Sequence, residues 1–278
     1  MRELGGKVAV VTGGGSGIGR GMALAFADAG MKVVVADIEL PAAEKVAAEI
    51  AARGARALAV HTDVTRRASV EELAEQTWRE LGAAHLLCNN AGVAVFGTLD
   101  EQRDSDWSWL LSVNLEGVVN GLQAFLPRMK AQPGPKHVVN TASVAGIAAL
   151  PGLGIYTATK YAVVAISETL RLEGPRYELG CSALCPGAVH TNIMTSERNR
   201  PTELGQSKPF VPPGGGSLGD VLSRGRDPLW VGRRVRAGVE NDEAYIFTDP
   251  RSRGLLDARF AAMRAGYDAA DRYGDGPA

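Results

Sequence analysis

The stretch KVAVVTGGGSGIGRGMALAFADAG, residues 7–30, decides the fold. Residues 8–11 are a short branched apolar run typical of a central parallel strand, and residues 18–29 have the apolar spacing of a helix. The turn between them carries three spaced glycines, Gly13, Gly17 and Gly19. Such a turn lets the backbone approach a pyrophosphate at the amino end of the helix, although the TGxxxGxG spacing also fits an ordinary tight turn.

Similar strand-like runs follow, alternating with helical segments along the chain. KVVVAD ends at Asp37, ALAVH leads to Asp63 and Val64, and HLLCN leads to Asn90. This alternation predicts an α/β fold with a single Rossmann-type, doubly wound parallel sheet and helices on both faces. Because 278 residues can bury one sizeable core, we expect one dinucleotide-binding catalytic domain spanning residues 1–278.

The carboxylates that end the second and third strands suggest how a dinucleotide would be chosen. Asp37 lies eighteen residues after Gly19, near the distance at which a carboxylate accepts hydrogen bonds from the adenosine ribose and repels a 2′-phosphate. Asp37 therefore favours NAD, while Arg20 is the nearby cation that keeps NADP as an alternative. The alternative role of Asp37 is to cap the next helix. Asp63 could meet the adenine amino group.

Two further patterns concern local geometry. Ser69 with Glu72 predicts a capping box for the helix after the third strand. The side-chain amides of Asn89 and Asn90 would tie neighbouring strands together, with Gly92 leaving room for a cofactor. The alternative interpretation of the two asparagines is an Asx turn.

A second stretch, NTASVAGIAALPGLGIYTATK at residues 140–160, carries the candidate catalytic groups. Tyr156 and Lys160 are four residues apart in a helical segment, so both side chains project from one helix face. Ser143 ends the apolar run HVVNTAS, at the carboxyl end of a predicted strand, where open α/β sheets bind ligands. The alternative is that YTATK is only a surface turn of an amphipathic helix.

These three side chains suit proton transfer. A tyrosine with an ordinary pKa of about 10 holds its proton too tightly to act as a base near neutral pH. The Lys160 ammonium would favour the phenolate, and lowering the pKa by roughly 3 units requires about 4 kcal/mol of differential stabilisation. Ser143 would donate a hydrogen bond to the substrate oxygen and hold it within reach of Tyr156.

The bulk properties argue against several other functions. A formal net charge of -1 gives no electrostatic basis for binding nucleic acid or an anionic membrane surface. Because the chain has no signal-peptide pattern and no apolar run long enough to span a bilayer, we expect a soluble, cytoplasmic protein. Three cysteines agree with a reducing compartment, and none lies at metal-ligand spacing from a histidine, so a catalytic metal is not expected.

Together these residues resemble the short-chain dehydrogenase/reductase family over about residues 7–191. The matching features are TGGGSGIG, Asp37, Asp63, NNAG, Asn114, Ser143, YTATK and PGAVHT. The resemblance implies that Tyr156 is the catalytic acid/base and that Lys160 modulates its pKa and binds the ribose. It implies that Ser143 orients the substrate and that Asn114 holds a proton-relay water.

The same resemblance implies a cofactor and an assembly. The cofactor would be NAD, bound by Gly13, Ser16, Gly17, Ile18, Gly19, Asp37, Asp63, Val64, Asn90, Tyr156, Lys160, Val189 and Thr191. In this family the helices that carry the Asn114 and Tyr156 equivalents commonly form subunit contacts, which implies a homodimer or homotetramer.

The resemblance weakens after Thr191, and we expect substrate choice to be decided there. Residues 192–227 include VPPGGGSLGD, which is too rich in glycine and proline for a stable helix or strand. We interpret this part as a flexible substrate loop, with an ordinary insertion as the alternative. A C-terminal helix is predicted at about 250–272. It carries a stripe more typical of a core or a subunit interface than of an active-site wall, Phe260, Met263 and Tyr267.

Apolar residues near the candidate catalytic groups indicate the substrate class. They are Val95, Phe96, Val144, Leu150 and Leu153. Such a lining presents hydrocarbon to the reacting carbon. We therefore predict an oxidoreductase that transfers a hydride between NAD(H) and a hydrophobic secondary alcohol or ketone, alicyclic, aryl or similar. The alternatives are an NADPH-dependent ketoreductase and a non-catalytic dinucleotide-binding sensor.

Overall fold

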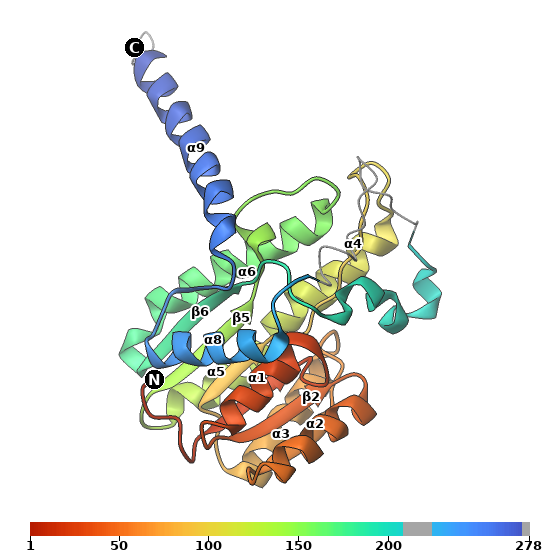
Figure 1. Ribbon diagram of the computed structural model, residues 1–278, viewed down its shortest axis with the longest axis vertical. Coiled ribbons are helices and arrows are strands. Elements are labelled where there is room, and N and C mark those ends of the chain that lie inside the picture. Colours follow the sequence, from red (N-terminus) through yellow and green to blue (C-terminus); the bar gives the residue numbers. More distant parts are fainter. Residues whose placement is uncertain (208–223, 274–278) are drawn as a thin grey trace.

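The computed structural model describes residues 1–207 and 224–273. In this part of the chain, seven parallel strands form one sheet in the order β3-β2-β1-β4-β5-β6-β7 (Figure 1). The strands are β1 (Val8–Thr12), β2 (Lys32–Asp37), β3 (Ala57–His61), β4 (Leu86–Asn89), β5 (Lys136–Thr141), β6 (Leu179–Cys185) and β7 (Tyr245–Phe247). The strand order reverses between β1 and β4, where open α/β sheets form a crevice. The predicted Rossmann-type α/β class is confirmed.

Helices cover both faces of the sheet because successive strand side chains point to opposite faces. One face is covered by α1 (Gly17–Ala27), α2 (Leu40–Ala52) and α8 (Pro228–Glu240). The other is covered by α3 (Arg67–Leu81), α5 (Gly117–Ala131) and α6 (Gly154–Glu173). Val11 of β1 shares a buried cluster with Phe26 of α1, whereas Val10 shares the opposite cluster with Phe125 of α5.

The start of α3 differs from the prediction. The helix begins at Arg67, with Arg66 at the N-cap position, so Ser69 lies inside the first turn. The Ser69 hydroxyl accepts a hydrogen bond from the Asp63 N–H at 3.0 Å instead. The predicted Ser69–Glu72 capping box is wrong because the loop after β3 takes the serine as its partner.

A π-helical turn interrupts the helix that precedes β5. The helix α4 (Asp104–Leu111) passes into α5 through this turn, η1 (Ser112–Glu116). Wider π-helical turns inside α-helices occur frequently at functional sites. Here the turn carries Asn114, which is fully buried.

Short 3-10 segments connect several of these elements. They are η2 (Val144–Gly146), η3 (Pro175–Tyr177), η4 (Asn192–Asn199), η5 (Thr202–Leu204) and η6 (Pro250–Ser252). The predicted flexible loop at 192–227 thus contains η4 and η5 in its first part. Its residues 208–223 lie outside the described part of the chain.

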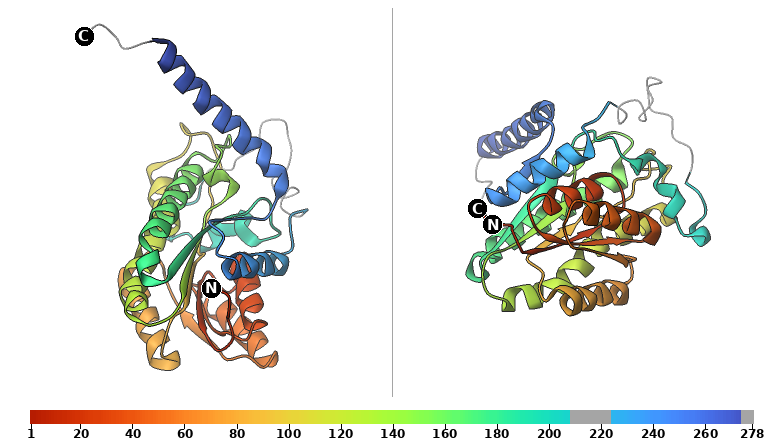
Figure 2. Two further views of the ribbon diagram at one scale, coloured as in Figure 1. Left: turned by 90° about the vertical axis from the view of Figure 1, so that its left-hand side faces the viewer. Right: turned by 60° about the horizontal axis from the view of Figure 1, so that its bottom comes forward.

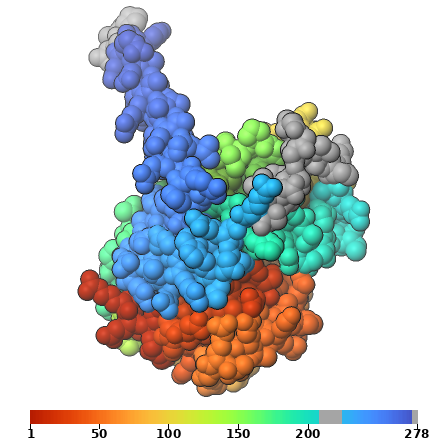
Figure 3. All heavy atoms as spheres, viewed as in Figure 1, coloured from red at the N-terminus to blue at the C-terminus, as the bar shows by residue number. Residues whose placement is uncertain are grey.

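A long C-terminal helix, α9 (Arg253–Tyr273), follows η6 and points away from the sheet (Figures 1 and 2). In the space-filling view its C-terminal part stands clear of the body of the molecule (Figure 3), whereas Leu256 and Arg259 near its start contact the rest of the chain. None of its residues is buried. The apolar stripe predicted on this helix is therefore not part of the core of this chain.

Candidate functional site

A cavity of about 700 Å³ lies at the carboxyl ends of the strands. Six strands contribute the residue at or just after their last position, namely Gly13, Asp37, Thr62, Asn90, Ala142 and Pro186. Every site residue predicted from the sequence lines this cavity except Gly19 and Asn114. Those two are buried against residues of the lining. The structure therefore brings the predicted residues to one place.

The glycine turn between β1 and α1 has the shape of a phosphate cradle. Gly13 has a φ of +61°, and a Cβ there would lie 2.9 Å from the Ala91 Cα, so a larger residue would clash. A Cβ at Gly19 would lie 2.0 Å from the Gly13 carbonyl oxygen. The helix begins at Gly17, where the first N–H groups have no intrahelical partner and favour an anion. These features fit the pyrophosphate of a dinucleotide.

Asp37 lies at the end of β2 with its carboxylate oriented by the backbone. One oxygen accepts a hydrogen bond from the Gly15 N–H at 2.8 Å, and the other accepts one from the Glu39 N–H at 2.9 Å. Arg20 is the cation on which the alternative of NADP depended. Its guanidinium lies 2.7 Å from the Glu49 carboxylate. The guanidinium of Arg20 is therefore already paired, and Arg20 does not line the cavity.

Two asparagines tie neighbouring strands together at the floor of the cavity. The Asn89 amide donates to the Asn140 side chain at 2.9 Å, which joins β4 to β5. The Asn90 amide donates to the Thr12 carbonyl at 3.0 Å and accepts from the Thr141 hydroxyl at 3.2 Å. Asn90 thus links the ends of β1 and β5 across β4. This is the strand-tying role, not the Asx turn.

The remaining predicted cofactor residues surround the glycine turn. A Cβ at Gly17 would lie 3.0 Å from the Thr191 Cγ2, so the segment after β6 packs closely over the turn. The Asp63 carboxylate accepts hydrogen bonds from the Thr65 N–H at 2.9 Å and from its hydroxyl at 2.7 Å. Two buried valines complete this part of the lining, Val64 and Val189.

Asn114 fixes the π-helical turn against the loop after β4. Its Oδ1 accepts a hydrogen bond from the Val93 N–H at 2.8 Å, and its Nδ2 donates to the Val93 carbonyl at 2.9 Å. Nδ2 also lies 3.3 Å from the Thr159 hydroxyl of α6. A Cβ at Gly92 would lie 3.3 Å from Asn114 Oδ1 and 3.5 Å from Lys160 Nζ. The asparagine and the lysine therefore meet where this glycine leaves space.

The three candidate catalytic side chains converge beside this point. Ser143 follows β5 and its hydroxyl accepts a hydrogen bond from the Ala145 N–H at 3.1 Å. Tyr156 lies in the first turn of α6 within hydrogen-bonding reach of Ser143. Lys160 lies one turn later, with its Nζ 5.5 Å from the centre of the Tyr156 ring and 2.8 Å from the Thr141 carbonyl oxygen.

Burial shifts the pKa of both Tyr156 and Lys160. Burial raises the pKa of the phenol, and its hydrogen bond with Ser143 lowers the pKa by less. Burial also lowers the pKa of Lys160 to about 8. Lys160 alone therefore does not lower the tyrosine pKa in the chain without a cofactor, because loss of hydration disfavours the charged form of both groups. The prediction that Lys160 lowers this pKa with the help of a bound nicotinamide cation stays a prediction. An additional positive charge is needed to favour the phenolate.

An apolar wall borders Tyr156, as the sequence predicted in part. Phe96, Val144, Leu150 and Leu153 line the cavity, whereas Val95 is buried behind the wall. Sequence reasoning missed Trp109 of α4, which lines the cavity and packs in the same cluster as Ile155. It also missed further apolar members, Val93, Val113, Ile193, Met194 and Leu204. Trp109 and Val113 are four residues apart, and this helical spacing was the available signal.

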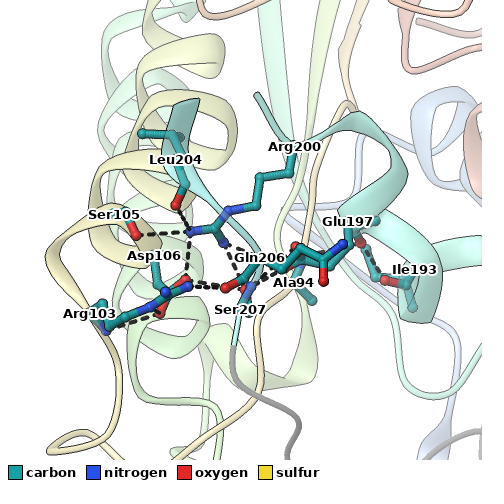
Figure 4. A network of polar contacts seen from close by, with 11 residues as sticks. Ala94, Arg103, Ser105, Asp106, Ile193, Glu197, Arg200, Leu204, Gln206 and Ser207 are labelled. Atoms are coloured by element: carbon teal, nitrogen blue, oxygen red, sulfur yellow. Dashed lines mark hydrogen bonds and ion pairs between the residues drawn. The ribbon is translucent and has the colours of Figure 1, made fainter. Parts of the chain in front are cut away.

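The segment Asn192–Ser207, which we call the strap, is anchored to α4 by a buried ion pair (Figure 4). The Arg200 guanidinium lies 2.8 Å from the Asp106 carboxylate, and both side chains are almost fully buried. It also donates hydrogen bonds to Ser207 at 2.7 Å and Ser105 at 3.1 Å, and stacks 5.0 Å from the Trp109 ring. No local sequence pattern predicts this pairing of residues far apart in the chain.

Three further features of the described residues concern metals, membranes and cysteines. No three histidine, cysteine, aspartate or glutamate side chains among them cluster as a metal ion would require. No helix among them is long and apolar enough to cross a membrane. The three cysteines are free thiols and all are buried.

Known proteins resemble this chain in sequence over most of its length. The family model described as short chain dehydrogenase matches residues 7–202. A protein named C alpha-dehydrogenase from Sphingobium sp. is 34% identical over 265 residues, which cover 95% of this chain and 87% of that protein. The CLA biosynthesis dehydrogenase/reductase of Lactiplantibacillus plantarum is 32% identical over 268 residues, with 93% of each chain covered.

A solved structure also resembles this chain over nearly its whole length. The crystal structure of a short chain dehydrogenase/reductase from Burkholderia phymatum, in complex with NAD, has a TM-score of 0.90 to this chain at 37% identity. The match covers 96% of this chain and 97% of that one. With the glycine turn, the Tyr156–Lys160 pair and the family match over residues 7–202 in agreement, the chain belongs to the short-chain dehydrogenase/reductase family.

Proposed function

We propose that this protein is an NAD-dependent oxidoreductase that interconverts a hydrophobic secondary alcohol and its ketone. The observation that carries the proposal is the convergence of Ser143, Tyr156 and Lys160 in a cavity that also contains the glycine turn and Asp37. The family relationship supports the class of reaction, and the Burkholderia phymatum structure in complex with NAD supports the choice of cofactor.

The chain's own residues would handle the proton. When bound, NAD⁺ supplies the hydride acceptor and a positive charge on its nicotinamide ring. Tyr156 takes the proton of the alcohol hydroxyl, while Ser143 donates a hydrogen bond that holds the substrate oxygen in reach. Because burial raises the pKa of Tyr156, the phenolate depends on positive charge nearby, and the Lys160 ammonium contributes to it. Water held at the turn that carries Asn114 would then relay this proton from Tyr156 through Lys160 to solvent, which regenerates the phenolate.

Cofactor choice would depend on Asp37. Its carboxylate is held in place by two backbone N–H groups and retains lone pairs for the ribose hydroxyls. A ribose 2′-phosphate would bring a second negative charge against it. We therefore favour NAD over NADP.

The apolar wall would select the substrate. Phe96, Leu150 and Leu153 present hydrocarbon to the same cavity as Tyr156. Such a lining favours an alicyclic, aryl or similar hydrophobic carbinol over a small charged acid. Two of the relatives are named as a dehydrogenase and a dehydrogenase/reductase, in agreement with the reaction class.

We further propose that residues 1–278 act as one catalytic domain in a homodimer or homotetramer. All the described strands belong to one sheet, and the cavity draws on six of them. The segments 192–207 and 224–227 would act together with the intervening residues as the substrate loop.

The test is a screen of cyclic, aryl and steroidal alcohols with NAD⁺ and NADP⁺, followed through the absorbance of the reduced nicotinamide. Turnover with NAD⁺ is expected, and Tyr156→Phe should lower kcat by about 10²–10⁴-fold while the Kd for NAD⁺ changes by less than about twofold. Tyr161→Phe, one helical position after Lys160 and outside the cavity, is the matched control and should remain active.

Three outcomes would contradict parts of the proposal. Unchanged turnover in Tyr156→Phe would remove the mechanism. A clear preference for NADP⁺ would overturn the argument from Asp37 and favour a ketoreductase. Tight NAD⁺ binding without turnover on the whole panel would favour a dinucleotide sensor.

A further inference from the structure

Glu39 connects the strap to the strand that carries Asp37. The Glu39 N–H donates to the Asp37 carboxylate at 2.9 Å, so the two acidic residues are held in a fixed relation. The Glu39 carboxylate accepts hydrogen bonds from the Arg198 guanidinium at 2.9 Å and from the Asn199 amide at 2.8 Å. This contact joins residues 159 positions apart and links η4 to the segment just after β2.

In this contact the guanidinium of Arg198 is paired with the Glu39 carboxylate. Among the described residues that line the cavity, the cationic ones are Lys160 and Arg198. Lys160 Nζ lies 5.5 Å from the centre of the Tyr156 ring. Arg198 instead contacts Glu39, two residues after Asp37, where the ribose is expected. The Arg198 side chain is 37% exposed, whereas that of Arg200 is buried. Besides Glu39, the Arg198 guanidinium donates a hydrogen bond to the Thr195 carbonyl of its own segment at 3.0 Å.

A guanidinium beside a ribose-binding carboxylate is the group that would receive a 2′-phosphate, through bidentate charge-assisted hydrogen bonds. Glu39 holds that group instead. Hydrogen bonding from Asn199, together with the charge and hydrogen bond of Arg198, keeps the pKa of Glu39 below its usual range, so the carboxylate stays ionised near neutral pH.

We propose that Glu39 is a second determinant of dinucleotide choice, because its pairing with Arg198 withholds from a ribose 2′-phosphate a cation that could bind it. The inference rests on the proposed binding of NAD. Asp37 would repel the extra phosphate directly, and Glu39 would remove the partner that could offset this repulsion. Neutralising Glu39 should therefore release Arg198 toward the ribose.

The experiment is calorimetric titration of the full chain with 5′-AMP and with adenosine 2′,5′-bisphosphate, which report on the ribose site without turnover. Glu39→Gln should raise the affinity for the bisphosphate relative to 5′-AMP by about fivefold or more. The double variant Glu39→Gln/Arg198→Ala should return this ratio to the wild-type value. Arg198→Ala alone should leave the ratio of the two affinities within about twofold of the wild-type value.

Glu49→Gln is the matched control. It also removes one carboxylate, and it releases Arg20 and Arg53 from their ion pairs with Glu49. Because these arginines do not line the cavity, the ratio should stay within about twofold of wild type. If Glu49→Gln raised the affinity ratio as much as Glu39→Gln does, the cause would be a general effect of charge. The assignment of dinucleotide choice to Glu39 would then be overturned.

Other outcomes separate this inference from the proposed function. If the wild type binds NAD⁺ but Glu39→Gln leaves the ratio unchanged, the role of Glu39 is wrong and the proposed function stands. A rise that persists in the double variant would assign the effect to Glu39 itself and overturn the part of Arg198. Failure of the wild type to bind either NAD⁺ or 5′-AMP would overturn both proposals.

A separate observation concerns α9, which is 21 residues long without a buried residue. Phe260, Met263 and Tyr267 lie three and four positions apart, so they share one helix face, whereas Leu256 at the start of the helix packs against a core cluster of the same chain. Phe260 and Met263 are about half exposed and Tyr267 is 74% exposed. Because helices in water owe most of their stability to burying an apolar face, this face requires a partner.

The charges beside the stripe favour a second copy of the same helix. Asp257 and Arg264 flank the stripe on one side. If two copies of α9 cross antiparallel, with Phe260 of each against the partner's Met263, Asp257 lies beside the partner's Arg264 in both directions. Antiparallel self-association is therefore complementary in both shape and charge.

We infer that α9 pairs with α9 of a second copy of this chain. Sedimentation of the full chain should show an associated species that Met263→Glu weakens by about tenfold or more in Kd. Ala265→Glu, on the opposite face of the helix, should leave association unchanged within about twofold. Asp257→Arg should weaken it, and Asp257→Arg/Arg264→Asp should restore it.

The inference is overturned by a wild type that remains a monomer, by association that survives Met263→Glu, or by a charge-exchanged double variant that fails to recover. None of these substitutions touches the core, since no residue of α9 is buried. Circular dichroism of each variant would check that the fold is intact.

Discussion

Two of the buried cations in this molecule have opposite surroundings. Lys160, beneath Tyr156, is 3% exposed, and its Nζ donates to the Thr141 carbonyl without taking part in any ion pair found among the described residues. Arg200, at the root of the strap, is also buried but lies 2.8 Å from Asp106 and 3.4 Å from Glu197. One cation lacks a carboxylate, and the other has two.

This difference indicates that the charge of Lys160 serves the chemistry, whereas the charge of Arg200 serves the structure. Burial lowers the pKa of Lys160 to about 8, so its ammonium form is held at a cost that no carboxylate offsets. Such a group is expected where chemistry requires it. Arg200 instead has its charge balanced, and the pair anchors the strap to α4 beside Trp109. The following predictions test this contrast.

The largest expected effect is on turnover in Lys160→Met. We expect kcat to fall by about 10²–10⁴-fold, because the ammonium that supports the phenolate is gone. The free energy of unfolding at pH 7 should not decrease, since methionine fills a similar volume and buries no charge. Steady-state kinetics and urea unfolding measure the two effects.

Lys136→Met is the control for this substitution. Lys136 is also buried and its Nζ donates to the Gln132 carbonyl at 2.7 Å, but it does not line the cavity. Activity should therefore be retained. A loss of more than about 2 kcal/mol of stability in Lys160→Met would make this lysine a structural group and break the contrast.

A smaller but still large effect is expected on stability in Asp106→Asn. This change leaves the buried Arg200 guanidinium without its closest counter-charge, and we expect unfolding to become easier by about 3 kcal/mol. Glu197→Gln removes a half-exposed partner at 3.4 Å and should change stability by less than about 1 kcal/mol. Urea denaturation compares the two, and equal effects would contradict the structural role of the buried pair.

The smallest expected effect, taken per pH unit, is a dependence of stability on pH. Between about pH 8 and the ordinary lysine pKa of 10.5, Lys160 loses its proton in the folded chain but keeps it when unfolded. The unfolded state then binds more protons, so the stability of the wild type rises relative to Lys160→Met, by at most about 1.4 kcal/mol per pH unit. Below pH 8 the difference should be constant. Urea unfolding across this range measures it, and a flat difference from pH 8 to 10.5 would show that Lys160 is not desolvated.

Local patterns predicted much of the site. The glycine turn, Asp37 and the Tyr156–Lys160 pair depend on residues a few positions apart in a strand, turn or helix, and all of them line the cavity. The same reasoning failed for the Ser69–Glu72 capping box. There, a hydrogen bond from Asp63 competed with a local pattern that was compatible with the helix but not required by it.

Long-range contacts could not be predicted in this way. The Asp106–Arg200 pair and the Glu39–Arg198 contact join residues far apart in the chain, and neither residue of either pair belongs to a recognisable motif. Val95 was expected in the apolar wall because of its type, but the packing of α4 and α6 placed Trp109 there and put Val95 behind it.

The sequence by itself determined the order and type of the elements, the turn that can receive a pyrophosphate, and which phenol and amine lie on one helix face. These follow from short-range steric and hydrogen-bonding rules, which act within a few residues. Only the tertiary structure decided the pKa of Tyr156, the partner of each buried cation and the exposure of α9. Those properties depend on how much water the rest of the chain excludes from a group, and on which distant side chains then replace it.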